Sequence, residues 1–275
     1  MTITVLIDNA LSPNKNLATE HGLSLYIDTG CKKILCDTGA SELFAVNAES
    51  MNIDITQCDF TFISHGHNDH SGGLHALFEK VDEVNVYMQK NILHEQYFSS
   101  RKGEKRNISC DKKTLEEHKR EITFISTTQQ IAEGIFAVQC KSNTFTTPYG
   151  NTFLTKNNGE KEVFDNFEHE LSLAFTTPKG LVIISPCSHC GVMNIIEECR
   201  RVSKCDKIHA FIGGFHFVEG DTCTTEAETF ATTIRHHYPD TVFYTGHCTC
   251  DTAKEILAKR TENIFFFATG SIINV

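Results

Sequence analysis

The stretch Ser64-His65-Gly66-His67-Asn68-Asp69-His70 places three imidazoles and a carboxylate in the six positions that follow Ser64. It comes directly after an apolar run, Phe60–Ser64, that predicts a buried strand, and before a helical pattern over Ser71–Phe78. A turn at the end of a strand lets close neighbours point inward from different directions. Imidazole and carboxylate together suit zinc, manganese or iron. The stretch therefore predicts a metal-binding turn between a strand and a helix.

Within this turn, we expect His65 and His67 to share one metal while Asp69 and His70 hold a second. Four ligands cannot complete the coordination of two metals, so further ligands should come from distant loops. Three later strand ends offer a histidine after small residues, which let the backbone approach a ligand closely. They read Pro186-Cys187-Ser188-His189, Gly213-Gly214-Phe215-His216 and Thr245-Gly246-His247. A single histidine after a strand is usually structural, but three in the same position favour metal binding.

Short apolar runs alternate with helical patterns over the rest of the chain. Strands are predicted at Ile3–Ile7, Leu23–Ile27, Lys33–Cys36, Val84–Tyr87, Ile122–Ile125, Ile135–Val138, Leu171–Thr176, Leu181–Ser185, Ile208–Ile212, Thr241–Tyr244 and Ile264–Phe267. Helices are also predicted at Ser41–Met51, Gly191–Val202, Thr224–His236 and Asp251–Lys259. This α/β order favours two sheets flanked by helices over a doubly wound sheet. We expect one domain, 1–275, with lid-like insertions at about 94–120 and 140–170.

The composition narrows the class of protein. The formal net charge is −10, which argues against the basic surface that non-specific nucleic-acid binding needs. No stretch approaches the roughly 18 apolar residues of a membrane span, and Met1–Asp8 is typical of a strand rather than a signal peptide. We therefore expect a cytoplasmic protein that acts on a small molecule, with neither nucleic acid nor membrane as a partner. The apolar tail Thr261–Val275 favours a last buried strand over a homodimer surface.

The 12 cysteines leave alternatives open. Cys187-Ser188-His189-Cys190 is formally a C-x-x-C motif, and Cys248-Thr249-Cys250 lies close to His247. A structural four-cysteine zinc site would, however, need a second pair at C-x-x-C spacing. A redox-active C-x-x-C would need a thioredoxin-like βαβ context, which is missing here. Cys190 and Cys250 are better interpreted as small residues that pack near the metal ligands.

The motifs resemble those of the metallo-β-lactamase superfamily. Within it they are similar to the branch that contains archaeal dihydropterin-ribofuranosylaminobenzene-phosphate synthases. The matching stretches span nearly the whole chain: Glu20–Ser24, Leu35–Gly39, Ser64–Leu74, Cys187–Gly191, Gly213–His216 and Gly246–Thr249. The resemblance implies a four-layer αββα sandwich that binds two divalent metal ions. Zinc is the first expectation, with iron or manganese as alternatives.

Carried over position by position, the resemblance implies one metal bound by His65, His67 and His189 and another bound by Asp69, His70 and His247. Asp37 would orient ligands through hydrogen bonds, and Cys187 would lie beside the ligands. Many members place a bridging carboxylate after the strand that corresponds to Leu181–Ser185. This chain has Cys187-Ser188-His189 there instead, so either His189 or Cys187 would complete the site.

The predicted activity is that of a metal-dependent hydrolase, in which a metal-activated water attacks a small phosphorylated or ester substrate. Asp69 would ligate a metal and orient the water, and His216 would protonate the leaving group or donate a hydrogen bond to the substrate. A pterin-type synthase or transferase is the first alternative, by analogy with the archaeal branch. An iron-dependent, dioxygen- or sulfur-oxidising enzyme is another. A non-enzymatic metal-binding protein would have no reason for lids.

Overall fold

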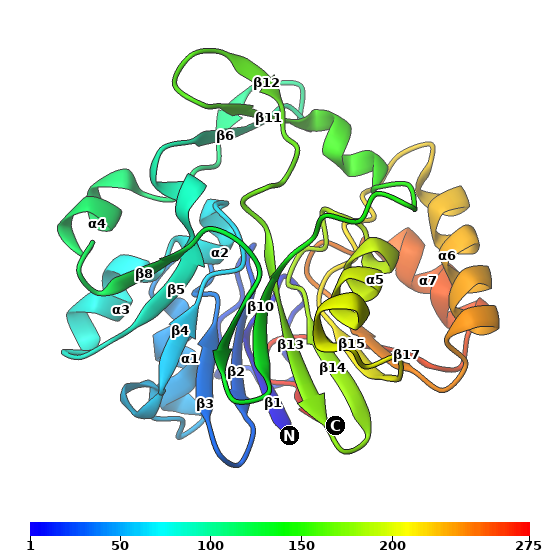
Figure 1. Ribbon diagram of the computed structural model, residues 1–275, viewed down its shortest axis with the longest axis horizontal. Coiled ribbons are helices and arrows are strands. Elements are labelled where there is room, and N and C mark those ends of the chain that lie inside the picture. Colours follow the sequence, from blue (N-terminus) through cyan, green and yellow to red (C-terminus); the bar gives the residue numbers. More distant parts are fainter. The chain divides into compact units, whose positions relative to one another are not determined.

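The computed structural model describes residues 1–275, which form two compact units. Unit 1 comprises Met1–Ser126, Phe153–His169 and Phe267–Val275, and unit 2 comprises Thr127–Thr152 and Glu170–Phe266. Each unit contains a seven-stranded sheet with helices beside it (Figure 1). The predicted α/β arrangement of two sheets with flanking helices is thus confirmed, while the prediction of a single domain stays a prediction.

The large sheet of unit 1 has the order β18-β1-β2-β3-β4-β5-β8. Its strands are β1 Thr2–Ile7, β2 Ser24–Asp28, β3 Lys33–Cys36, β4 Phe60–Phe62, β5 Val86–Gln89, β8 Ile122–Ile125 and β18 Ile272–Asn274. The strands from β18 to β3 pair antiparallel, and those from β3 to β8 pair parallel. The helices of this unit are α1 Leu43–Ser50, α2 Asn68–Ser71, α3 Leu74–Lys80 and α4 Lys112–Glu117. Phe44 of α1 and Leu77 of α3 are buried in the core with Met88 of β5.

A second, four-stranded sheet in unit 1 has the order β12-β11-β6-β7. It consists of β6 Gln96–Ser99, β7 Arg106–Asn107, β11 Leu154–Asn157 and β12 Glu162–Phe164. These strands lie in the two segments for which the sequence predicts irregular lids. Their residues lack the alternation of apolar and polar side chains that is typical of a strand. Because β6 also pairs with β11 across more than fifty intervening residues, no local sequence pattern predicts these four strands.

The sheet of unit 2 has the order β17-β16-β15-β14-β13-β10-β9. Its strands are β9 Gln129–Ala132, β10 Ile135–Gln139, β13 Leu171–Thr177, β14 Gly180–Ile184, β15 Ile208–Ile212, β16 Val242–Thr245 and β17 Ile264–Phe266. The helices of unit 2 are α5 Val192–Ser203, α6 Cys223–His237 and α7 Asp251–Arg260. Short 3-10 helices lie at Ile55–Gln57 and Lys90–Leu93 in unit 1, and at Tyr149–Phe153, where the chain passes from unit 2 to unit 1. Strands β14 to β17 are parallel, so the loops that follow β14, β15 and β16 all leave the same edge of the sheet.

The core of unit 2 is rich in phenylalanine. Phe215 contacts Phe230 of α6 with ring centroids 4.8 Å apart, and it packs edge-on against Phe243 of β16 at 6.4 Å. Such aromatic pairs add stability beyond the area that they bury. This core fixes the loop after β15, which carries Phe215. No helix of the structure combines the length and the apolar content that a membrane span requires.

Candidate metal centre

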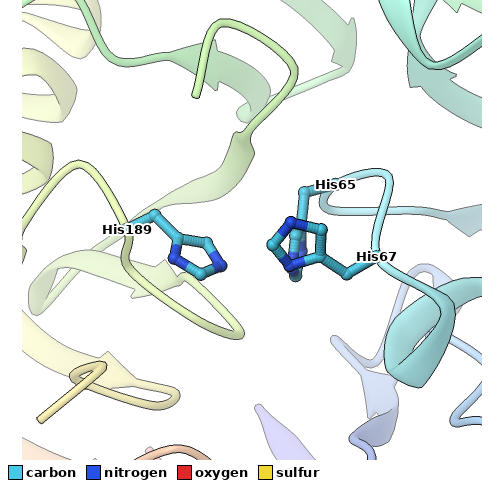
Figure 2. Close-up of side chains that lie close together, drawn as sticks. All are labelled: His65, His67 and His189. Carbon is cyan, nitrogen blue, oxygen red and sulfur yellow. The ribbon is translucent and has the colours of Figure 1, made fainter. Parts of the chain in front are cut away.

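The histidine-rich turn of unit 1 joins β4 to α2. His65, His67 and His70 are buried, and the side chain of Asp69 is 17% exposed. The Nε2 atom of His65 lies 3.1 Å from the Nδ1 atom of His67. Figure 2 draws these two rings on the turn. The structure therefore brings the imidazoles of this turn together, as the spacing predicts.

Asp37 is the buried carboxylate behind the turn. Its Oδ1 accepts a hydrogen bond from the Ser64 backbone N–H at 2.7 Å. Its Oδ2 accepts a bond from the Ser64 hydroxyl at 2.7 Å and lies 2.7 Å from Nδ1 of His70. The Ser64 hydroxyl in turn lies 2.9 Å from Nδ1 of His65. One carboxylate thus fixes the His70 ring directly and the His65 ring through Ser64, and both Nδ1 atoms are engaged.

Asp69 lies at the more exposed side of the turn. Its Oδ2 is 3.3 Å from Nε2 of His21 and 3.8 Å from Nε2 of His70. Its carbonyl accepts a hydrogen bond from the Leu23 N–H at 3.2 Å, which anchors the segment that contains His21 against α2. The sequence motif Glu20–Ser24 is therefore a structural neighbour of the turn, although His21 itself was not among the predicted site residues.

A second buried pair, Asp165 and His169, also supports the turn. The Gly66 N–H donates to Nδ1 of His169 at 3.1 Å, and Nε2 of His169 lies 3.0 Å from Oδ2 of Asp165. Burial alone would raise the pKa of Asp165, but the charge and hydrogen bond of His169 lower it to about 2. Burial, followed by the neighbouring His169, lowers the pKa of His67 to about 3. Sequence reasoning missed this pair because 103 residues separate His169 from Gly66.

The side chain of Tyr97 in β6 packs closely against the metal-binding turn. A Cβ atom at Gly66 would lie 2.3 Å from Cε2 of Tyr97, so only glycine fits between the two histidines. The buried Tyr97 hydroxyl donates to Glu95 at 3.1 Å, and Glu95 pairs with the Lys156 ammonium at 2.9 Å. Part of the segment predicted as a lid therefore packs against the metal-binding turn.

In unit 2, the loop after β14 presents His189, which is fully buried. The carboxylate of Glu170 accepts hydrogen bonds from the His189 N–H at 2.7 Å and the Cys190 N–H at 2.8 Å. Nδ1 of His189 lies 3.2 Å from Oδ1 of Asn151. Ser188 adopts a left-handed backbone with φ of 57°. Figure 2 draws His189 on this loop.

The loops after β15 and β16 present His216 and His247, both buried. Their backbones are left-handed, with φ of 53° and 46°. Gly213 precedes His216, and a Cβ there would lie 1.8 Å from the Ser185 carbonyl, so the loops after β14 and β15 touch through backbone. The ring centroids of His189 and His216 are 4.1 Å apart. Two of the three predicted strand-end histidines thus contact each other.

Two thiols lie beside His216. Sγ of Cys187 is 3.4 Å from Sγ of Cys248 and 3.8 Å from Nδ1 of His216. The His216 N–H donates to Sγ of Cys248 at 3.3 Å. Burial alone would raise the pKa of Cys248, but hydrogen bonds from Cys187 and His216 hold it well below its usual value. Sequence reasoning placed Cys187 beside the ligands and Cys248 close to His247, but it did not predict that these two thiols meet.

The donor types decide which ions fit. Imidazole nitrogens dominate in unit 1, and imidazole nitrogens with sulfurs dominate in unit 2. In unit 2 the ligand atoms of Cys187, His216 and Cys248 all lie within 4.8 Å of one another. Magnesium and calcium prefer oxygen ligands, whereas zinc and iron accept nitrogen and sulfur. The residues present fit zinc or iron.

Comparisons with known proteins agree with this chemistry. Residues 18–135 match the sequence profile of the metallo-beta-lactamase superfamily. The 7,8-dihydropterin-6-methyl-4-(beta-D-ribofuranosyl)-aminobenzene-5'-phosphate synthase of Methanocaldococcus jannaschii is 30% identical over 264 residues, which cover 90% of this chain and 87% of that protein. An uncharacterized protein of the same organism is 27% identical over 218 residues, 78% of this chain and 79% of its own length.

Among solved structures, a metal-dependent hydrolase of the beta-lactamase superfamily superposes with a TM-score of 0.83 and 27% sequence identity. The match covers 100% of this chain and 99% of the other. Together with the sequence profile, it confirms the fold class that the motifs predict.

Proposed function

Because the chain belongs to the metallo-β-lactamase superfamily, we propose that it is a metal-dependent hydrolase acting on a small ester or phosphorylated substrate. The observation that carries the proposal is the buried turn of His65, His67 and His70, whose rings are fixed by Asp37. Burying polar imidazoles and orienting them through a carboxylate lowers the stability of the fold. Such a cost is expected where the imidazoles bind a metal, but not in a turn that is only structural.

We assign the ligands as the sequence motifs imply. One metal takes His65, His67 and His189, and the other takes Asp69, His70 and His247. Engagement of Nδ1 in His65 and His70 supports this assignment, because it leaves metal binding to their Nε2 atoms. Zinc fits the donor set best, with iron or manganese as alternatives. Bound metals would supply Lewis-acid stabilisation and a water of lowered pKa.

The protein's own groups then have distinct tasks. The Asp69 carboxylate, which is 17% exposed, orients the attacking water and accepts its hydrogen bond. His216 donates a hydrogen bond to the substrate or protonates the leaving group. Asp37 keeps the rings of His65 and His70 in place. Such prior positioning lowers the entropic cost of reaching the transition state.

A synthase is the second candidate, because the archaeal synthase named above matches 90% of this chain. The same residues would then activate a substrate group in place of water. The cytoplasmic location, the small-molecule partner, the role of the inserted segments as lids and the absence of nucleic-acid partners stay predictions, as does the alternative of a homodimer.

The test combines metal analysis with a substrate screen. Purified protein should contain zinc, iron or manganese and should hydrolyse at least one phosphodiester, lactone or thioester. His65→Ala/His67→Ala should lose both activity and bound metal. His75→Ala is the matched control, because His75 is exposed on α3 and pairs only with Glu79. Full activity of the metal-free double variant would contradict the proposal, and turnover of the archaeal synthase's substrates alone would favour the second candidate.

A further inference from the structure

The two cysteine sulfurs beside His216 in unit 2 have no task in the hydrolysis proposed above. We call Cys187, Cys248 and His216 the thiol cluster. Cys187 and His216 are buried, and Cys248 is partly buried. The three residues come from the loops after β14, β16 and β15, so three separate strand ends deliver them to one place. The superfamily motifs leave Cys187 as an alternative to His189 in the hydrolase centre, but they assign no metal shared by Cys187 and Cys248.

The distances within the thiol cluster match the edges of a tetrahedral metal site. Zinc bonds of about 2.3 Å to sulfur and about 2.0 Å to nitrogen place two sulfurs about 3.8 Å apart, and sulfur and nitrogen about 3.5 Å apart. The observed separations are 3.4 Å between the two Sγ atoms and 3.8 Å from Sγ of Cys187 to Nδ1 of His216. A disulfide would need about 2.05 Å, so the sulfurs are spaced for a shared ion rather than a bond.

The surrounding backbone is built around these sulfurs. A Cβ at Gly214 would lie 2.3 Å from Sγ of Cys248, so the glycine leaves room for the sulfur. The His216 N–H donates to the same sulfur at 3.3 Å. Backbone N–H groups of this kind stabilise metal-bound thiolates. Ser188 and His216 have left-handed backbones beside the cluster, a strained conformation that simple packing of small residues does not require.

We propose that Cys187, Cys248 and Nδ1 of His216 bind a thiophilic divalent cation, with Zn²⁺ as the expected ion, at a site of its own within unit 2. Two cysteines and one histidine leave a fourth position for water or substrate, the arrangement of catalytic rather than structural zinc. Both cysteines bind as thiolates, so any proton that either thiol still carries is released to solvent. Coordination through Nδ1 leaves Nε2 of His216 protonated, and it can still donate the hydrogen bond proposed above.

Cobalt provides a readout that does not depend on activity. The full-length protein is reduced, stripped of metal and titrated with Co²⁺ alone, and the near-ultraviolet absorption of sulfur-to-cobalt charge transfer is followed. The unmodified protein should develop this band. Cys187→Ser/Cys248→Ser should lose it, together with about one equivalent of Zn²⁺ per chain in a parallel zinc titration. Cys205→Ser is the matched control, because Cys205 lies in the same unit, outside the thiol cluster, and its thiol donates to the Lys207 carbonyl.

The outcomes separate this site from the proposed hydrolase centre. His65→Ala/His67→Ala should keep the sulfur–cobalt band while losing activity, so either proposal can fail alone. A titration without the band, or an equal band in Cys187→Ser/Cys248→Ser, would show a packed thiol pair and overturn the site. If the double variant does not fold, thiol labelling of the unmodified protein decides instead: Zn²⁺ should slow the reaction of two thiols, and unchanged labelling would overturn the site.

Discussion

Unit 1 gathers three histidines on one short turn, whereas unit 2 takes single histidines from three strand ends. In unit 1 the rings are held by side chains, through Asp37 on His70 and Ser64 on His65. In unit 2 the backbone is held as well: Glu170 accepts a hydrogen bond from the His189 N–H, the loops contain left-handed residues, and Asn151 lies beside the His189 ring. The comparison suggests that a dense local motif needs its rings oriented, while dispersed ligands need their loops positioned.

The largest expected effect tests whether the histidines of unit 1 and unit 2 bind metal in the same catalytic centre. We expect His67→Ala and His189→Ala each to lower kcat/KM by about 10³-fold or more, because loss of metal stabilisation of about 4 kcal/mol corresponds to that factor. Steady-state kinetics and metal content of each variant provide the measurement. Near-normal activity in His189→Ala alone would show that His189 of unit 2 is not a ligand of the catalytic metal centre.

The second prediction separates ring orientation from loop positioning. Asp37→Asn should reduce metal affinity about 10- to 100-fold, because the carboxylate that orients His70 and, through Ser64, His65 is gone. Glu170→Gln should instead cost about 1–2 kcal/mol of unfolding free energy with a smaller change in affinity, because only backbone N–H bonds weaken. Metal titration and urea unfolding of both variants give the two numbers. Equal losses of affinity would remove the distinction.

Two glycines, one in the turn of unit 1 and one in a loop of unit 2, test the comparison between the two units further. Gly66→Ala would place a Cβ 2.3 Å from the buried Tyr97 ring, and Gly214→Ala would place one 2.3 Å from Sγ of Cys248. Each should cost about 1–3 kcal/mol of stability by overpacking, measured by chemical unfolding. Tyr97→Leu should recover part of the loss in Gly66→Ala but none in Gly214→Ala, as a double-mutant cycle would show. Recovery in both would mean that the effects are not local.

The last expected effect is a pH dependence in unit 1, which changes stability gradually over a range of pH. The pKa of His67 falls from 6.5 when unfolded to about 3 when folded. The unfolded chain therefore binds the proton first, and stability is lost as pH falls from about 6.5 toward 3, by at most about 1.4 kcal/mol per pH unit. Urea unfolding of the metal-free protein between pH 7 and pH 4 measures this slope. His67→Asn should flatten it, and an unchanged slope would assign the dependence to another group.

Local patterns predicted much of this molecule. Apolar runs predicted β3, β8 and β15 at the residues observed. The turn from His65 to His70 was predicted from the close spacing of its histidines and aspartate. Strand ends with glycine correctly marked the loops of His216 and His247. These features share one property: all their signals lie within a few residues of each other.

What the sequence did not predict depends on distant partners. The pair Asp165 and His169 lies in a segment without periodicity, and its contact with Gly66 exists only once the chain has folded. The sheet formed by β6, β7, β11 and β12 depends on pairing between two separate insertions. The contact between Cys248 and Cys187 likewise joins two loops that are distant in the sequence. Tertiary proximity of this kind leaves no trace in single-sequence spacing.

The pairing of β18 with β1 has a consequence for how the chain is made. Ile3 stands opposite Ile273, and the Asp8 N–H bonds the Thr269 hydroxyl at 2.8 Å. During synthesis, β1 is therefore an open edge strand until the residues after unit 2 have left the ribosome. We expect unit 2, whose last strand is β17, to complete its sheet first. The final strand of unit 1 would then act as a late closing step that protects the nascent chain from edge-to-edge association.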